Sequence, residues 1–157
     1  MSGWLFKIEP SELSIDDLAA RGARGVCWDG VRNYQARNML RDQIRLGDKV
    51  FIYHSSCAEV GIAGIGKVIR AAYPDPSQFD PDSKYADPAS KPEQPRWISV
   101  DVRHEETFPE ILSLAALKAN PALAEMALVQ RGNRLSVMPV TTAQWRAILS
   151  MKRANKL

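Results

Sequence analysis

One stretch of the sequence decides the fold: residues 28–37, which read WDGVRNYQAR. The Asp29-Gly30 pair is a turn signal that follows a short apolar run at 26–28, and this predicts the end of a brief strand. Asn33 is one of the residue types that cap helix N-termini, and apolar residues recur at helical spacing from there to about Ile44. The stretch therefore predicts a strand, a turn and a helix in direct succession.

Strand patterns lie on both sides of this unit. Residues 4–9 alternate between an apolar face and a second face that carries Lys7 and Glu9, which predicts a half-buried strand. Residues 49–55 form a continuous apolar run, which is typical of a strand covered on both faces. A further strand is expected at 59–69, where the glycines indicate a bulge or a close backbone approach.

The remaining expected elements complete a mixed pattern. They are a short helix that begins at Ser14, a long proline-rich loop at 73–95, a strand at 97–103, short helices at 111–118 and 120–126, a strand at 134–140, and a last helix capped by Thr141 with Gln144. Short connections between successive strands favour an α+β fold: a small, curled or barrel-like, mostly antiparallel sheet with helices packed outside.

The bulk properties of the chain fit one domain over residues 1–157. A chain of this length buries about two-thirds of its unfolded surface, so it needs neither a disulfide nor a metal to fold. Cys27 and Cys57 are far apart and lack zinc-site spacing, which favours two free thiols in a reducing compartment. No signal peptide or membrane span is visible, so we expect an intracellular protein. The net charge of +3 permits polyanion binding without requiring it.

A search for catalytic and cofactor motifs finds little. The glycines at 61–66 have the spacing G-x-x-G-x-G within a strand pattern, whereas a dinucleotide site needs G-x-G-x-x-G at a helix start. His54 and His104 lack metal-site spacing, so neither a metal nor another cofactor is expected. His54 and Ser55 are adjacent in a strand and point to opposite faces, so they do not form a nucleophile–base pair directly.

Residues 28–37 resemble the signature W-x-G-V-R-N-x-x-A of the EVE domain family. Other pieces follow in the order that this family has, and together they cover nearly the whole chain. They are Trp4 with the run at 7–10, the Gly47-Asp48 turn, FIYHS at 51–55, GIAG at 61–64, YPD at 73–75, WISVDV at 97–102 and RLSVMPV at 134–140.

The resemblance implies a fold of the PUA-like superfamily, similar to YTH and ASCH domains. It also implies non-catalytic binding of modified bases in DNA or RNA through one concave pocket. The expected partner is therefore a nucleic acid that carries modified bases, with no membrane involved. The location would be the cytoplasm or nucleoid in a bacterium and the nucleus in a eukaryote.

A base that leaves its stack costs a few kcal/mol, and stacking on a protein aromatic returns about 1–3 kcal/mol. Aromatic, amide and turn residues near the signature are therefore the candidates for contact with the base. The candidates are Trp28, Gly30, Val31, Arg32, Asn33, Tyr53, His54, Ser55 and Trp97 for the base, and Arg131 and Arg134 for phosphates. Trp28, Tyr53 and Trp97 are equally suited to a core, and Asn33 to a helix cap.

A rival hypothesis is an ASCH-like amidohydrolase that acts on a modified nucleoside. Lys7 and Glu9 share one strand face and would then act together with Ser55. A third possibility is an adaptor protein whose pocket has no ligand. The sequence carries no signal for an oligomeric state.

Overall fold

The structure is a computed structural model that describes residues 3–154. Its six strands form one sheet in the order β2-β5-β4-β3-β1-β6. The strands are β1 (Gly3–Ile8), β2 (Val26–Trp28), β3 (Lys49–His54), β4 (Gly61–Pro74), β5 (Ile98–Ser113) and β6 (Val137–Val140). The helices are α1 (Ile15–Ala20), α2 (Tyr34–Asp42), α3 (Leu114–Ala119) and α4 (Thr142–Ala154).

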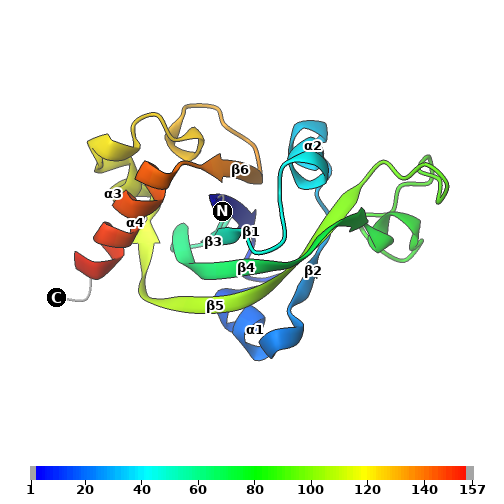
Figure 1. The fold of residues 1–157 in the computed structure, drawn as a ribbon, viewed down its shortest axis with the longest axis horizontal. Coiled ribbons are helices and arrows are strands. Elements are labelled where there is room, and N and C mark those ends of the chain that lie inside the picture. The colour runs from blue at the N-terminus through cyan, green and yellow to red at the C-terminus, as the bar shows by residue number, and fades with distance from the viewer. Residues whose placement is uncertain (1–2, 155–157) are drawn as a thin grey trace.

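The expected α+β class and mostly antiparallel sheet are confirmed. Only the β1–β3 pair is parallel among the strand pairs of residues 3–154. The sheet curls strongly but does not close into a barrel, because the edge strands β2 and β6 do not pair with each other within the described part of the chain (Figure 1). Helix α2 packs against β4, β5 and β6, and so covers the opening that the curled sheet leaves.

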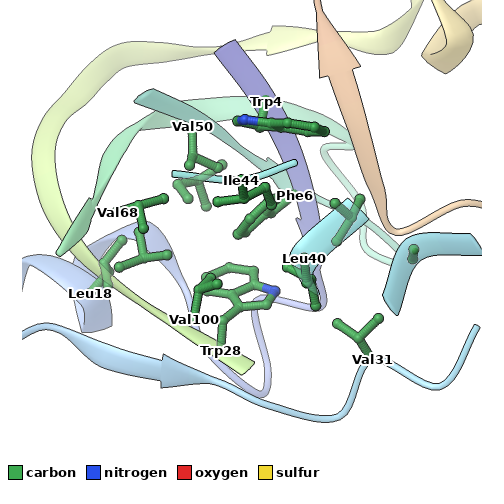
Figure 2. Packing of buried hydrophobic residues seen from close by; sticks show 14 of the residues in the cluster. Trp4, Phe6, Leu18, Trp28, Val31, Leu40, Ile44, Val50, Val68 and Val100 are labelled. Atoms are coloured by element: carbon green, nitrogen blue, oxygen red, sulfur yellow. The ribbon is translucent and has the colours of Figure 1, made fainter. Parts of the chain in front are cut away.

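The first core lies inside the curl of the sheet. Figure 2 shows side chains from β1, β2, β3 and α2 converging there. Phe6 and Trp28 meet with their ring centroids 5.3 Å apart, and Leu40 of α2 is fully buried beside them. Burial of each such large side chain stabilises the fold by about 1.5–3 kcal/mol.

The second core covers the opposite face of the sheet with α3 and α4. Phe51 of β3 stacks on Trp145 of α4 with a centroid distance of 3.8 Å. Leu5 of β1 is fully buried in this core. The expectation that residues 4–9 form a half-buried strand is therefore wrong at Leu5, because α4 and its neighbours cover the face that alternation assigned to solvent.

The long strands β4 and β5 also differ from expectation. They pair along most of their length and carry residues 75–97 beyond their far ends (Figure 1). The helix expected at 111–118 begins only at Leu114, because Ile62 pairs with Leu112 and keeps residues 111–113 in the sheet.

The expected elements at 120–126 and 134–140 are shorter in the structure. They contain a 3₁₀ turn at Pro121–Leu123 and the strand β6 at Val137–Val140. None of the helices within residues 3–154 is long and apolar enough to cross a bilayer.

Both predicted helix caps are confirmed. The Asn33 side chain accepts a hydrogen bond from the Ala36 N–H at 3.0 Å. Thr141 and Gln144 form a reciprocal capping box, with bonds of 3.0 and 3.1 Å. These local bonds fix where α2 and α4 begin.

Gly64 marks the close approach that the strand glycines predicted. The register of β4 against β5 shifts beside it, and a Cβ at this position would lie 2.3 Å from the Glu106 carbonyl oxygen. No backbone carbonyl can give way that far without separating the two strands.

We expect Gly64→Ala to destabilise the fold by about 1–3 kcal/mol, the usual cost of overpacking. Urea denaturation followed by tryptophan fluorescence measures this change. An unchanged unfolding midpoint would contradict the close β4–β5 approach.

Candidate functional site

A hollow of about 360 Å³ lies at the C-terminal end of β1. We call it the Trp28 hollow. Seven residues singled out from the sequence line it: Lys7, Glu9, Trp28, Gly30, Val31, Ser55 and Arg134. Six others complete the wall: Ile8, Glu12, Asp29, Lys84, Tyr85 and Ser136.

Strand pairing brings these distant segments together. β1 and β3 run parallel, and the N–H of Ser55 donates to the carbonyl of Ile8 at 3.0 Å. Lys7 N–H likewise donates to the Ser136 carbonyl at 2.8 Å. Two carboxyl ends of neighbouring strands therefore meet at one rim, beside the turn that follows β2.

Trp28 has both of the roles that the sequence left open. It is only 4% exposed and packs on Phe6 in the first core, yet it also forms part of the wall of the hollow. Replacing Trp28 would therefore damage the core as well as the site, so it is a poor residue for testing function.

Tyr85 is a site residue that the sequence analysis missed. It comes from the 73–95 loop and packs on Gly30, where an added Cβ would lie 2.6 Å from the Tyr85 ring. Its hydroxyl donates to a Glu12 carboxylate oxygen at 3.0 Å. The sequence predicted a long proline-rich loop at 73–95, but no pattern within it marked Tyr85.

The guanidinium of Arg32 holds this loop against the 28–31 turn. It donates at 2.6 and 3.2 Å to the Tyr85 carbonyl, at 2.9 Å to Asp75 and at 3.1 Å to Ser77. A fifth bond goes to the carbonyl of Val31. Five bonds match the five N–H groups of arginine, so none remains for a ligand. The predicted contact of Arg32 with a base thus lacks a free donor in this arrangement.

We call the bonds of Arg32 to Asp75, Ser77 and Tyr85 the latch, and Asp75 is its buried acceptor. It is 0% exposed and accepts further bonds from the Gly30 N–H at 2.9 Å and from Ser77. Burial alone would raise the pKa of Asp75, but the hydrogen bonds from Ser77, Arg32 and Gly30 outweigh burial and lower it. The carboxylate is therefore held in its charged form.

Trp97 and Asn33 lie away from the Trp28 hollow. The Trp97 ring stacks on Tyr34 with centroids 4.8 Å apart, and its indole N–H donates to Asp87 at 2.8 Å. The Asn33 side chain is engaged as the cap of α2. Their contacts with a base remain predictions, because neither residue lines the hollow in which the other candidates meet.

His54 points to the opposite side of the sheet from Ser55. Its Nε2 accepts a hydrogen bond from the Ile15 N–H at 3.1 Å, at the start of α1. Burial lowers the pKa of His54, which keeps the ring neutral and able to accept. The structure therefore places His54 apart from the hollow.

Four ionisable side chains that line the hollow make no hydrogen bond or ion pair with another residue within residues 3–154: Lys7, Glu9, Asp29 and Arg134. The pKa values of two of them, Lys7 and Asp29, are shifted. Desolvation lowers the pKa of Lys7. Desolvation, with the nearby Asp75 charge, raises the pKa of Asp29. The hollow thus offers an unused donor, an unused acceptor and two aromatic rings to a planar polar ligand.

Tyr53 and Arg131 line a second hollow of about 740 Å³, and Lys7 belongs to both hollows. No cluster of three or more His, Cys, Asp or Glu residues suited to a metal occurs in the described part of the chain.

Comparisons of the sequence with known proteins indicate one family. The model of the EVE domain matches residues 2–151. Human thymocyte nuclear protein 1 is 40% identical over 168 residues, which cover 96% of this chain and 74% of the human protein.

Solved structures agree with this comparison. A Pseudomonas syringae protein is 51% identical with a TM-score of 0.93, over 96% of this chain and 99% of that one. Human thymocyte nuclear protein 1, in complex with 5-methylcytosine-containing DNA, is 40% identical with a TM-score of 0.91, over 97% and 98% of the two chains. An ASCH protein from Zymomonas mobilis, with 7% identity and a TM-score of 0.57, shares the fold alone.

We expect Arg32→Met to destabilise the protein by about 3 kcal/mol, because it leaves the buried Asp75 charge without its ion-pair partner. Amides of residues 76–96 should also exchange faster with solvent. The folded-state pKa of Asp75 is lowered, so its contribution is present above its ordinary value of 3.8 and is lost as the pH falls below it.

The matched control is Arg41→Met, which breaks an exposed ion pair to Asp42. Its effect on the free energy of unfolding should be small beside that of Arg32→Met, because exposed ion pairs contribute little to stability. Equal effects of the two variants in urea denaturation would contradict the latch.

Proposed function

This chain belongs to the EVE domain family, and we propose that it binds a modified nucleobase of DNA or RNA in the Trp28 hollow. The base would leave its stack and enter the hollow, where the protein reads it without changing it. The observation that carries this proposal is that polar side chains without a protein partner lie beside the rings of Trp28 and Tyr85 in one hollow. The chain is also 40% identical to a protein whose structure was solved in complex with 5-methylcytosine-containing DNA.

The size and chemistry of the hollow support a base as the ligand. Its volume of about 360 Å³ lies in the range usual for small-molecule sites. Tyr85 contributes an aromatic ring that comes from a separate loop, so that an inserted base has a stacking surface. Glu12 orients this ring through the Tyr85 hydroxyl.

Asp29 gives the hollow a preference among bases. A carboxylate accepts from the exocyclic amine of cytosine or adenine, whereas thymine offers a carbonyl oxygen on the corresponding edge. Because no other described residue donates to Asp29, an incoming amine would meet an acceptor that no protein group occupies. We therefore propose an amine-bearing base, and a modified cytosine first, as the ligand.

The curated animal relatives are named as nuclear proteins. We propose that this chain likewise acts where nucleic acid is concentrated, which is the nucleus in a eukaryote and the nucleoid or cytoplasm in a bacterium.

Fluorescence anisotropy at one fixed salt concentration tests this function. The panel compares DNA and RNA oligonucleotides that are plain or carry methylated, hydroxymethylated or acetylated cytosine, or methylated adenine. Tyr85→Ala should weaken binding of the preferred oligonucleotide about 5- to 150-fold, the equivalent of about 1–3 kcal/mol of stacking. Asp29→Ala should reduce the preference for that base about tenfold or more.

Two matched controls lie in the same loop. Phe79→Ala removes an exposed aromatic ring, and Asp82→Ala removes an exposed carboxylate, and neither residue lines the hollow. Both variants should bind like the parent protein. Equal affinity of the parent for every oligonucleotide in the panel would refute the reading of modified bases.

One observation also keeps the hydrolase hypothesis open: Lys7, Glu9 and Ser55 line the same hollow. His54 cannot activate Ser55, because its ring bonds to the start of α1. Lys7 is then the candidate base in the hollow, because desolvation lowers its pKa.

We expect no release of acetate from N4-acetylcytidine, because within residues 3–154 the Ser55 hydroxyl makes no hydrogen bond to Lys7 or Glu9 that would activate it. Liquid chromatography of long incubations measures this. Turnover that Ser55→Ala abolishes, with the fold retained, would replace the reader proposal by the hydrolase.

A further inference from the structure

The second hollow is distinct in its charge. Its lining contains three basic residues, Lys7, Lys118 and Arg131, and no aspartate or glutamate. The rest of the lining is apolar or neutral, and Tyr53 forms one of its walls. The whole chain carries only a small net charge of +3, so this concentration of positive charge is local.

None of these basic groups is neutralised from within the protein. Lys7, Lys118 and Arg131 make no ion pair or hydrogen bond through their side chains within residues 3–154. Lys7 is half-buried in strand β1, where the Tyr53 ring lies 5.6 Å from its ammonium. A half-buried ammonium without a counter-ion is costly, and an anionic ligand would remove that cost.

Tyr53 adds an independent observation. The residue as a whole is 2% exposed, but its hydroxyl oxygen is not fully enclosed and makes no hydrogen bond to another described residue. A ligand in the hollow can therefore reach this hydroxyl, which is the polar end of an otherwise buried ring. Within this wall the Tyr53 hydroxyl is a donor without an acceptor, beside an ammonium without an anion.

We propose that this second hollow binds a phosphate of the nucleic-acid backbone, next to the nucleotide whose base occupies the Trp28 hollow. Lys7 lines both hollows and so links the two subsites. Lys118 and Arg131 contribute charge from α3 and from the segment before β6. The Tyr53 hydroxyl donates to the same phosphate. This inference rests on the proposed function for the order of the two subsites along the strand.

The salt dependence of binding tests the phosphate subsite separately from base reading. Each phosphate contact contributes about 0.7 to the slope of log affinity against log salt for single strands. Lys118→Ala and Arg131→Ala should each lower this slope by about 0.7 and weaken plain and modified oligonucleotides equally. Tyr53→Phe, which keeps the buried ring, should weaken both without changing the slope.

Lys91→Ala is the control for loss of one exposed positive charge, because Lys91 lines neither hollow. A slope unchanged by Lys118→Ala and Arg131→Ala, or lowered equally by Lys91→Ala, would overturn the phosphate subsite. A lowered slope without discrimination between modified and plain bases would retain this subsite and reject base reading. A parent protein that bound no oligonucleotide at low salt would refute both.

A competition arm separates backbone phosphate from free phosphate. Inorganic phosphate and chloride are compared as salts at equal ionic strength. Weaker oligonucleotide binding in phosphate, with a difference that Lys118→Ala abolishes, supports a backbone phosphate in this hollow, because the two phosphates then compete for one site. Binding of inorganic phosphate to this hollow that leaves oligonucleotide affinity unchanged would assign the hollow to free phosphate instead.

Discussion

The candidate site depends on the ion pair between Arg32 and the buried Asp75. This pair joins two segments that are 43 residues apart and sets the 73–95 loop against the turn after β2. Without it, the Tyr85 ring would have no fixed position over Gly30, and the Trp28 hollow would lose one wall. Arginine suits this role because its planar fork can satisfy several carbonyl and carboxylate oxygens at once. Arg32, which the sequence suggested as a contact for a base, therefore acts by positioning a loop of the protein itself.

Local patterns predicted the parts of the fold that local physics determines. The cap at Asn33 and the capping box at Thr141 are short-range hydrogen bonds, and both were correct. The burial of Leu5 was not predictable by alternation, because α4 arrives from the other end of the chain to cover it. The strand at 111–113 was likewise missed, because its conformation comes from pairing with residues 61–62 rather than from its own sequence.

The same distinction applies to the candidate site. The turn at 28–31, the end of β1 and Ser55 were singled out from the sequence by motif and residue type, but the parallel β1–β3 pairing that brings them together was not predicted. Tyr85 was not singled out, since its position depends on the distant latch. Trp97 and His54 had suitable chemistry, but their side chains are committed to Asp87 and to the start of α1. Chemical type alone therefore identified more residues than the geometry brings to one place.

The attachment of the 75–97 segment has an evolutionary consequence. Its two ends leave β4 and β5 at Pro74 and Ile98, which are direct partners in the sheet. A segment whose ends are neighbours can change in length or composition while both hydrophobic cores stay intact, provided that Arg32 and Asp75 persist. Because this segment supplies the Tyr85 wall, exchange of the segment alone would give related proteins different ligand preferences on an unchanged fold.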